Sequence, residues 1–373
     1  MSAIIVAGGG LAGGAAACAL AQAGREVVVL ERDRAPAHRM CGEFLSIEAQ
    51  ASLAAIGLDV EALGGARIAR LRLVRDAAAV GVALPFRGLG VTRRRLDAAL
   101  LDHAASCGAI VRRGVAVRGV DARAGLRLDL ADGSALRPEV LLLATGKHDL
   151  RGVRRRAAMP EALVGFKMYF RLRPAAQAAL LDHIDLILFA DGYAGLQLVE
   201  DGMANLSLLV DRARVQRTGG TWAGLLADLL ARNAVLADRL EGAVPLLDQP
   251  LSIFRVPYGF VHRPGPDDPA GVFRLGDQAG VIPSFTGDGM AIALHSAARA
   301  TAAVLGGGTA FAYHAALRRD IRGQIMRAAA LYRVARGAPT QRLLFEAAGV
   351  FPGLLRLAAR YTRVPQLARS LPS

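Results

Sequence analysis

The sequence has few aromatic residues, few cysteines and no long apolar run. Aromatic side chains make up 5% of the 373 residues, and Trp222 is the single tryptophan. A surface on which nucleic-acid bases stack is therefore not expected. Three cysteines without paired spacing argue against a disulfide framework and fit a reducing compartment. No stretch approaches about eighteen uninterrupted apolar residues, so we expect no membrane span.

Sequence signals for export, metal binding and serine nucleophiles are also missing. The chain enters an apolar strand pattern at once, without a basic region and a cleavage site, which predicts a cytoplasmic protein. The seven histidines do not fall in ligand spacing with cysteine or glutamate, so no metal site is expected. No G-x-S-x-G motif is present.

Lysine is scarce although the chain is basic. The formal net charge is +14, but Lys147 and Lys167 are the only two lysines among the basic residues. A solvated, arginine-rich surface accounts for this charge. The alternatives are an anionic substrate, an acidic carrier protein or an anionic membrane surface.

What the sequence does contain is a dinucleotide-binding fingerprint at its N-terminus. A β-branched run leads into Gly8, Gly10 and Gly13, which form G-x-G-x-x-G, and an alanine-rich helical segment and a second apolar strand follow. These glycines permit the tight turn, the close approach of a pyrophosphate and the packing of helix on strand. Glu31, at the end of the second strand, can accept hydrogen bonds from ribose hydroxyls. The predicted contacts around this fingerprint also include Leu11, Ala12 and Arg32.

The stretch "GVFRLGDQAGVIPSFTGDGMAIALHSAARAT" resembles the second FAD signature of the para-hydroxybenzoate hydroxylase and geranylgeranyl reductase superfamily. The resemblance implies that Asp277 binds the ribityl chain and that Pro283, Gly287 and Gly289 line the flavin. It places the start of a helix near Asp288, whose side chain we expect to cap that helix with its positive dipole end toward the flavin. Met290 is the last predicted contact of this loop.

Three further stretches resemble the same superfamily. "HRMCGEFLS" implies that Arg39 contacts the pyrophosphate or adenosine and that Cys41 and Gly42 lie near the flavin. "VTRRRLDAALLDHAASCGA" places Arg93 as the arginine that reaches the cofactor. "LRPEVLLLATG" is expected to be the strand that closes the FAD domain.

Two departures leave the reaction open. Many hydroxylases of the superfamily carry Asp-Gly after the closing strand, whereas this chain has Thr145 and Gly146. NADH or NADPH is thus a candidate electron donor, and another donor is the alternative. In the substrate region the chain reads "YAGLQL", which keeps Tyr193 but lacks the aromatic residues of geranylgeranyl reductases. The lone Trp222 cannot form the Trp-x-Trp stretch of flavin-dependent halogenases.

The resemblance implies an FAD-dependent oxidoreductase that acts on a hydrophobic biosynthetic molecule, free or carrier-bound. We expect a monooxygenase working through a C4a-hydroperoxyflavin; the alternative is reduction or dehydrogenation by hydride transfer at flavin N5. A non-catalytic flavin-binding partner is a third option. Candidate catalytic residues are Tyr193, His295 and Cys41. Simple packing is the alternative for His295 and Cys41.

We expect an α/β chain, α+β overall, in which a Rossmann-type FAD domain is interleaved with an antiparallel substrate domain. The FAD domain is assigned to residues 1–75, 91–155 and 270–325, and the substrate domain to 76–90 and 156–269. Residues 326–373 form a C-terminal helical segment, apolar on one face and arginine-bearing on the other. It packs on the FAD domain, walls the substrate site or makes peripheral membrane contact.

Overall fold

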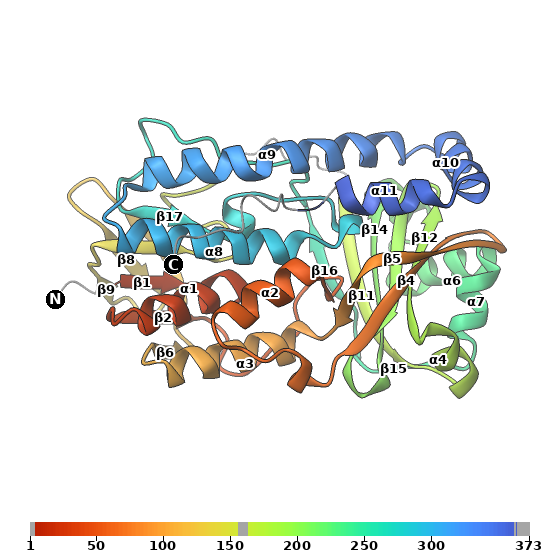
Figure 1. The fold of residues 1–373 in the computed structure, drawn as a ribbon, viewed down its shortest axis with the longest axis horizontal. Helices are drawn as coiled ribbons and strands as arrows, with labels where there is room; N and C mark the ends of the chain where they lie inside the picture. The colour runs from red at the N-terminus through yellow and green to blue at the C-terminus, as the bar shows by residue number, and fades with distance from the viewer. Residues whose placement is uncertain (1–3, 156–162, 362, 364–373) are drawn as a thin grey trace.

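Five short segments form a parallel sheet at one end of the elongated molecule (Figure 1). The computed structural model describes residues 4–155, 163–361 and 363. The sheet order is β17-β10-β1-β2-β6. Its strands are β1 (Ile4–Ala7), β2 (Val27–Glu31), β6 (Ile110–Arg113), β10 (Val140–Leu143) and β17 (Val272–Arg274).

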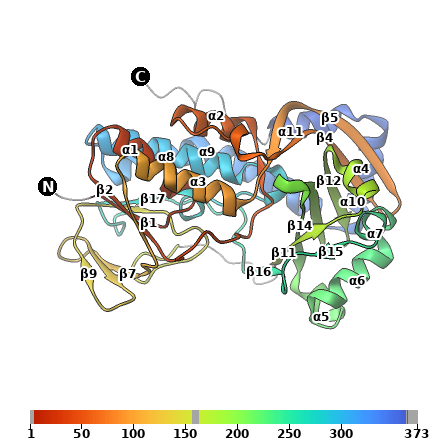
Figure 2. The ribbon, with the colours of Figure 1, turned by 90° about the horizontal axis from the view of Figure 1, so that it is seen from below.

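The central strands of the parallel sheet are covered on both faces, which explains the apolar runs of β1, β2 and β10. Ile4 and Val6 pack with α1 (Leu11–Gln22), α3 (Arg93–Ser106) and α8 (Gly289–Leu305). The alternate residues Ile5 and Ala7 pack against the opposite layer. That layer is a small antiparallel sheet of β7 (Val117–Asp121), β8 (Arg127–Leu130) and β9 (Ala135–Leu136), seen at the lower left of Figure 2. This half has the predicted Rossmann architecture.

The other half is built on a nine-stranded mixed sheet. Its order is β15-β11-β14-β13-β12-β4-β5-β3, with β16 also paired to β11. Its strands are β3 (Phe44–Leu45), β4 (Ala66–Arg75), β5 (Ala78–Gly90), β11 (Leu163–Arg171), β12 (Asp182–Phe189), β13 (Gly192–Leu198), β14 (Ala204–Asp211), β15 (Val244–Pro245) and β16 (Leu251–Phe254). Asp-Gly turns join β12, β13 and β14, where Asp191 and Asp201 have φ of 67° and 59°. Most pairings in this sheet are antiparallel, but β12 and β4 are parallel neighbours.

The chain passes repeatedly between the two sheets, as the interleaved arrangement predicted. One boundary differs from the prediction. β4 pairs with β5 and β12 in the large sheet, so residues 66–75 lie there and not with the first segment of the FAD domain. The segment after Thr221 forms two helices, α6 (Trp222–Arg232) and α7 (Ala234–Leu240), because Asn233 leaves helical geometry and caps α7. The remaining helices on this half and between the halves are α2 (Ile47–Ala55), α4 (Pro174–Leu180) and α5 (Arg212–Arg217).

Three C-terminal helices close one side of the molecule. The long α9 (Ala310–Val334) runs along the top of Figure 1 from the Rossmann half to the large sheet, and α10 (Ala338–Val350) and α11 (Gly353–Tyr361) lie over that sheet. The predicted segment 326–373 is therefore helical where it is described, and residues 362 and 364–373 lie outside the described residues. None of the described helices is both long and apolar enough to cross a membrane.

Candidate functional site

The glycine-rich turn after β1 forms a cradle that side chains would block. Gly8 has φ of +106°, and a Cβ there would lie 2.5 Å from the Ala144 carbonyl oxygen. A Cβ on Gly13 would lie 1.9 Å from the Gly8 carbonyl oxygen, so helix and strand pack only because it is absent. Gly10 is the N-cap of α1 and has no side chain, which leaves the amide groups of the first turn facing the pocket. Free amides and the positive helix end suit a pyrophosphate.

Glu31 is fixed at the end of β2 by three donors. Its Oε2 accepts the Gly9 amide at 2.8 Å, and its Oε1 accepts the Asp33 amide at 2.9 Å and Arg39 Nη2 at 3.2 Å. Arg39 also pairs with Asp33 at 2.5 Å. This buried carboxylate is held where the adenosine ribose of a dinucleotide would reach it, so the cradle fits such a cofactor.

A cavity of about 810 Å³ runs from this cradle into the large sheet. It is lined by most of the predicted cofactor residues: Gly8, Gly10, Leu11, Ala12, Glu31, Arg32, Arg39, Cys41, Gly42, Arg93, Thr145, Gly146, Asp277, Gly287, Gly289 and Met290. Pro283 and Asp288 do not line it, although their neighbours do. Gly13 acts through packing rather than contact, as its clash with Gly8 shows.

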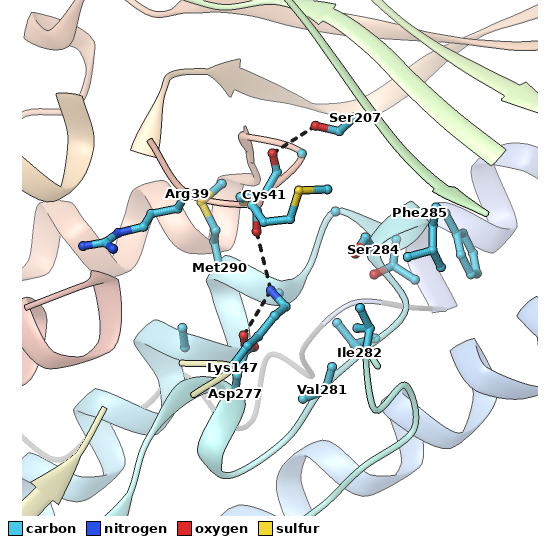
Figure 3. A pocket seen from close by; sticks show the side chains of 18 of the residues that line it. Arg39, Cys41, Lys147, Ser207, Asp277, Val281, Ile282, Ser284, Phe285 and Met290 are labelled. Carbon is cyan, nitrogen blue, oxygen red and sulfur yellow. Dashed lines mark hydrogen bonds and ion pairs between the residues drawn. The ribbon is translucent and has the colours of Figure 1, made fainter. Parts of the chain in front are cut away.

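A lysine that no sequence motif placed in the site lies beside the loop 276–290. Lys147 Nζ lies 3.2 Å from Asp277 Oδ2 and 3.5 Å from the Met40 carbonyl oxygen (Figure 3). Burial lowers the pKa of Lys147, but Asp277, with smaller contributions from Cys41 and Tyr258, raises it by more. The ammonium therefore stays charged beside the predicted ribityl contact.

Asp288 does not cap its helix through its side chain. It occupies the N-cap position of α8, but its carboxylate is wholly buried and directed away from the helix amides. It lies 3.1 Å from Arg363 and 3.4 Å from Gln324 Nε2. The start of α8 at Gly289 nevertheless faces the cavity, as predicted for a helix directed at the flavin.

Thr145 turns toward its own loop instead of the cavity centre. Its hydroxyl donates to the His148 carbonyl at 2.6 Å, and Gly146 follows with φ of +61°. The position therefore shapes a turn and supplies no charge where many hydroxylases carry an aspartate.

Residues 38–43 are held by the large sheet. Lys167 on β11 donates to the Arg39 carbonyl at 3.0 Å and pairs with Glu43 at 2.6 Å. Asn205 and Ser207 on β14 donate to the carbonyls of Gly42 and Cys41, at 3.0 and 3.1 Å. The segment that carries three predicted cofactor contacts is thus positioned by strands from the other half.

Glu43 is the centre of this network. Its carboxylate accepts from Tyr169 at 2.8 Å, Asn205 at 3.0 Å and the Arg93 amide at 2.7 Å, in addition to Lys167. Its backbone has φ of 61°, which is uncommon for a residue with a side chain. The sequence analysis passed over Glu43, Tyr169 and the roles of both lysines. One sequence signal pointed to the lysines: this arginine-rich chain has only two of them. Both form ion pairs at this site, Lys147 with Asp277 and Lys167 with Glu43.

The far end of the cavity is an apolar chamber with a chain of hydroxyl groups. Tyr193 Oη lies 3.2 Å from Tyr258 Oη, which lies 2.6 Å from Ser284 Oγ. The Tyr193 ring packs edge-on against Phe285 and Tyr332. Burial, followed by the neighbouring Tyr258, raises the pKa of Tyr193 well above its ordinary value. The Tyr193 hydroxyl therefore stays neutral at the wall of the chamber, where it can form hydrogen bonds.

The three candidate catalytic residues separate in space. Tyr193 and Cys41 line the cavity. His295 does not: it lies on the face of α8 that packs against α9, where its Nε2 is 2.9 Å from Asp320. Ala293 of the same helix does line the cavity, and two residues correspond to about 200° around a helix. The structure therefore gives His295 a packing role.

Comparison with known proteins first defines the class of fold. Residues 6–43 match the model of the NAD(P)-binding Rossmann-like domain. A flavin-dependent brominase has the same fold with a TM-score of 0.79 and 18% identity, over 97% of this chain and 93% of that chain. The myxobacterial chondrochloren halogenase aligns with a TM-score of 0.74 and 20% identity, over 97% and 90% of the two chains. The predicted fold class is confirmed.

Sequence similarity points to a different set of proteins. The chain is 33% identical over 157 residues to menaquinone reductase of Mycobacterium tuberculosis, strain H37Rv. Menaquinone reductase of Mycolicibacterium smegmatis is 32% identical over a segment of the same length. These matches cover 40% of this chain and 38% of each relative, so the similarity spans about two fifths of their length.

Proposed function

We propose that the chain is an FAD-dependent oxidoreductase that acts on a hydrophobic small molecule. The observation that carries this proposal is the continuous cavity, in which the dinucleotide cradle opens into an apolar chamber. Such a cavity of about 810 Å³ has the size of a ligand site and brings a cofactor and a second molecule into one space. The match of residues 6–43 to a Rossmann-like domain supports the cofactor half.

Bound FAD would supply the redox chemistry, and the side chains of this chain would hold the cofactor and the substrate. The amides of α1 and the carboxylate of Glu31 would bind its pyrophosphate and ribose. Asp277 and Lys147 would lie beside its ribityl chain and pyrimidine edge. Tyr193, with Tyr258 behind it, would hold the proton that accompanies reduction of the substrate. The aliphatic walls would exclude water from the reacting atoms.

For the reaction we propose reduction of a quinone- or isoprenoid-type substrate. Two observations support it: the relatives found by sequence are menaquinone reductases, and a chain of hydroxyl groups from Tyr193, Tyr258 and Ser284 lies at the chamber wall. Monooxygenation, the reaction expected from the sequence, is the second candidate because the superfamily resemblance includes hydroxylases. The lone Trp222 gives no support to halogenation, despite the shared fold.

An anaerobic single-turnover experiment separates these reactions. Protein loaded with FAD is reduced with dithionite and mixed with a short-chain menaquinone in detergent. Reoxidation of the flavin without oxygen supports the reductase, whereas turnover only with ¹⁸O₂ and a labelled product supports the monooxygenase. Flavin that binds but never exchanges electrons would indicate a non-catalytic flavin-binding protein. Replacing dithionite with NADH or NADPH tests the electron donor.

We also propose peripheral membrane contact through the C-terminal segment, where α10 and α11 expose a large apolar surface. The exposed side chains are Leu343, Val350, Phe351, Leu354, Leu357 and Tyr361. Arg342 and Arg356 are exposed beside them. Leu344 and Leu355 of the same helices line the cavity, which supports entry of a lipophilic substrate from a bilayer. Sedimentation with anionic vesicles, compared with neutral ones, tests the contact.

A further inference from the structure

A cluster of two thiols and an imidazole lies outside the cavity, between the helices behind the dinucleotide cradle. Cys18 is on α1, and His103 and Cys107 are on the last turn and C-cap of α3, which packs beside α1 (Figure 2). The two sulfurs and a ring nitrogen all lie within 4.8 Å of one another. Cys18 is fully buried, and His103 and Cys107 are half-buried, so the cluster is accessible from one side.

The distances match those around a tetrahedral zinc ion. Two thiolates bound to one Zn²⁺ at about 2.3 Å lie roughly 3.8 Å apart, and a thiolate and an imidazole nitrogen lie roughly 3.6 Å apart. The Sγ atoms of Cys18 and Cys107 are 3.6 Å apart, and Cys107 Sγ is 3.9 Å from His103 Nε2. The third pair, Cys18 Sγ and the His103 ring nitrogen, lies within 4.8 Å.

An oxygen atom faces the same point. The Ile56 carbonyl oxygen, at the C-cap of α2, lies 2.7 Å from His103 Nε2 and 3.7 Å from Cys18 Sγ. In this contact the carbonyl accepts, so Nε2 carries the hydrogen. On metal binding the ring would adopt the tautomer with its proton on Nδ1, which frees the Nε2 lone pair for the ion, and the carbonyl oxygen or a water would fill the fourth position.

We propose that Cys18, His103 and Cys107 form a zinc site that ties together α1, α2 and α3. Two thiolates balance the charge of the divalent ion, and soft sulfur with imidazole is a donor set that favours zinc over magnesium or calcium. Each thiol releases its proton as it binds, and no electron is transferred. The site is structural, since it lies behind the cradle and none of its three ligands lines the cavity.

Sequence spacing gave an incomplete picture of this site. The histidine spacing predicts no metal site, because no histidine stands in a familiar pattern with cysteine. His103 and Cys107 are in fact four residues apart, on one face of a helix. The third donor, Cys18, is 89 residues from Cys107 and meets it only in the fold.

The test uses the full chain loaded with FAD, with its cysteine thiols reduced and bound metal removed. Zn²⁺ and Co²⁺ are the probes. We expect one zinc per chain in competition with a chromophoric chelator, and a thiolate-to-cobalt charge-transfer band. Cys107→Ser should weaken the band, because one of the two thiolates is lost, and His103→Ala should weaken zinc binding. Cys41→Ser and His183→Ala are matched controls that should keep both signals. Flavin absorbance and far-UV circular dichroism report folding independently, so Cys107→Ser and His103→Ala remain informative if Cys18→Ser fails to fold.

Three results would overturn the proposal. The first is wild-type protein that takes up no zinc in competition with the chelator. The second is a cobalt spectrum that Cys107→Ser leaves unchanged. The third is protein, purified without reductant, whose Cys18 and Cys107 are joined in a disulfide and which binds no metal after reduction. None of these results bears on flavin binding or turnover, so they leave the proposed oxidoreductase function separately testable.

Discussion

The Nζ atom of Lys167 lies 2.6 Å from Oε1 of Glu43, and both side chains are wholly buried. The pair joins a strand of the large sheet to the segment that carries Arg39, Cys41 and Gly42. Burial raises the pKa of Glu43 and lowers that of Lys167, and their attraction opposes both shifts without cancelling them. Each partner therefore depends on the other to remain charged.

Removal of one partner should destabilise the fold more than removal of both. We expect Lys167→Met to lower the free energy of unfolding by about 3–5 kcal/mol, because it leaves a buried carboxylate unpaired. The double variant Lys167→Met, Glu43→Gln should recover part of that loss, since a neutral amide can still accept from Tyr169. Urea titrations measure both values. A double variant that is less stable than Lys167→Met would contradict this account.

FAD binding should depend on Glu31. Replacement by alanine removes the acceptor for the ribose hydroxyls and releases Arg39, so we expect the dissociation constant for FAD to rise about 10- to 100-fold. Quenching of flavin fluorescence measures the constant. Glu26→Gln, in an exposed position just before β2, is the control and should bind FAD normally. Equal affinity of Glu31→Ala and wild type would exclude this carboxylate as the ribose ligand.

Turnover should depend on the Tyr193 hydroxyl. We expect Tyr193→Phe to lower kcat by about 100-fold or more with little change in KM, because the phenyl ring still fills the chamber wall but cannot give a proton. Steady-state rates with a short-chain menaquinone provide the comparison. Tyr313→Phe alters a buried tyrosine outside the cavity and is the control. Unchanged kcat in Tyr193→Phe would remove this residue from the proton path.

Stability should fall in mild acid through a pair of buried histidines. Burial, then His262 and Arg274, lowers the pKa of His314 to about 3, and burial, then Arg274, lowers that of His262 to about 4. Unfolded histidines titrate near about 6.5, so the unfolded chain binds more protons below that pH. The stability present above about pH 6.5 is then lost as the pH falls toward 4.

His314→Gln tests this pH dependence. Glutamine can still accept the Arg274 amide, which His314 Nε2 accepts at 3.0 Å, but it does not titrate. We expect the slope of unfolding free energy against pH to fall between pH 4 and 6.5 by up to about 1.4 kcal/mol per unit. The half-buried His183 on β12 is the control position. An unaltered slope would mean that His314 is not the group that is protonated.

Membrane binding should depend on the exposed faces of α10 and α11. We expect Phe351→Ser with Leu357→Ser to weaken binding to anionic vesicles by about 10- to 100-fold, because each apolar side chain contributes through burial. Phe311→Ser changes an equally exposed phenylalanine at the start of α9 and should bind as wild type does. Equal loss in Phe311→Ser would show non-specific adhesion.

The parts of the site that could be predicted from sequence are those made by local spacing. Gly8, Gly10 and Gly13 lie within one turn, and the loop before α8 carries its own Gly-Asp pattern, so their geometry follows from a few neighbouring residues. The continuous apolar runs of β1 and β2 likewise indicated strands of a sheet that is buried on both faces.

Long-range contacts could not be predicted in this way. Glu43 and Lys167 are separated by more than one hundred residues, and the sequence around either residue gives no sign that the two side chains pair. His295 takes the packing alternative, because its direction around α8 depends on where α9 lies, which the local sequence does not show. Asp288 was placed correctly at the N-cap, yet its side chain is directed to Arg363, a residue near the far end of the chain. Residues 66–75 were assigned to the FAD domain although β4 lies in the large sheet, because the pattern of a strand does not show which other strand it pairs with.

The hydrogen bonds from β11 and β14 to residues 39–43 have a consequence for recombination between related chains. Donors from one half set the backbone path of a loop that serves the other half's cofactor. A chimera that took its glycine cradle from one protein and its large sheet from another would separate Glu43 from its lysine and Gly42 from its asparagine. The two halves must therefore diverge together, and a substrate chamber can be exchanged only with the cofactor loop that it holds.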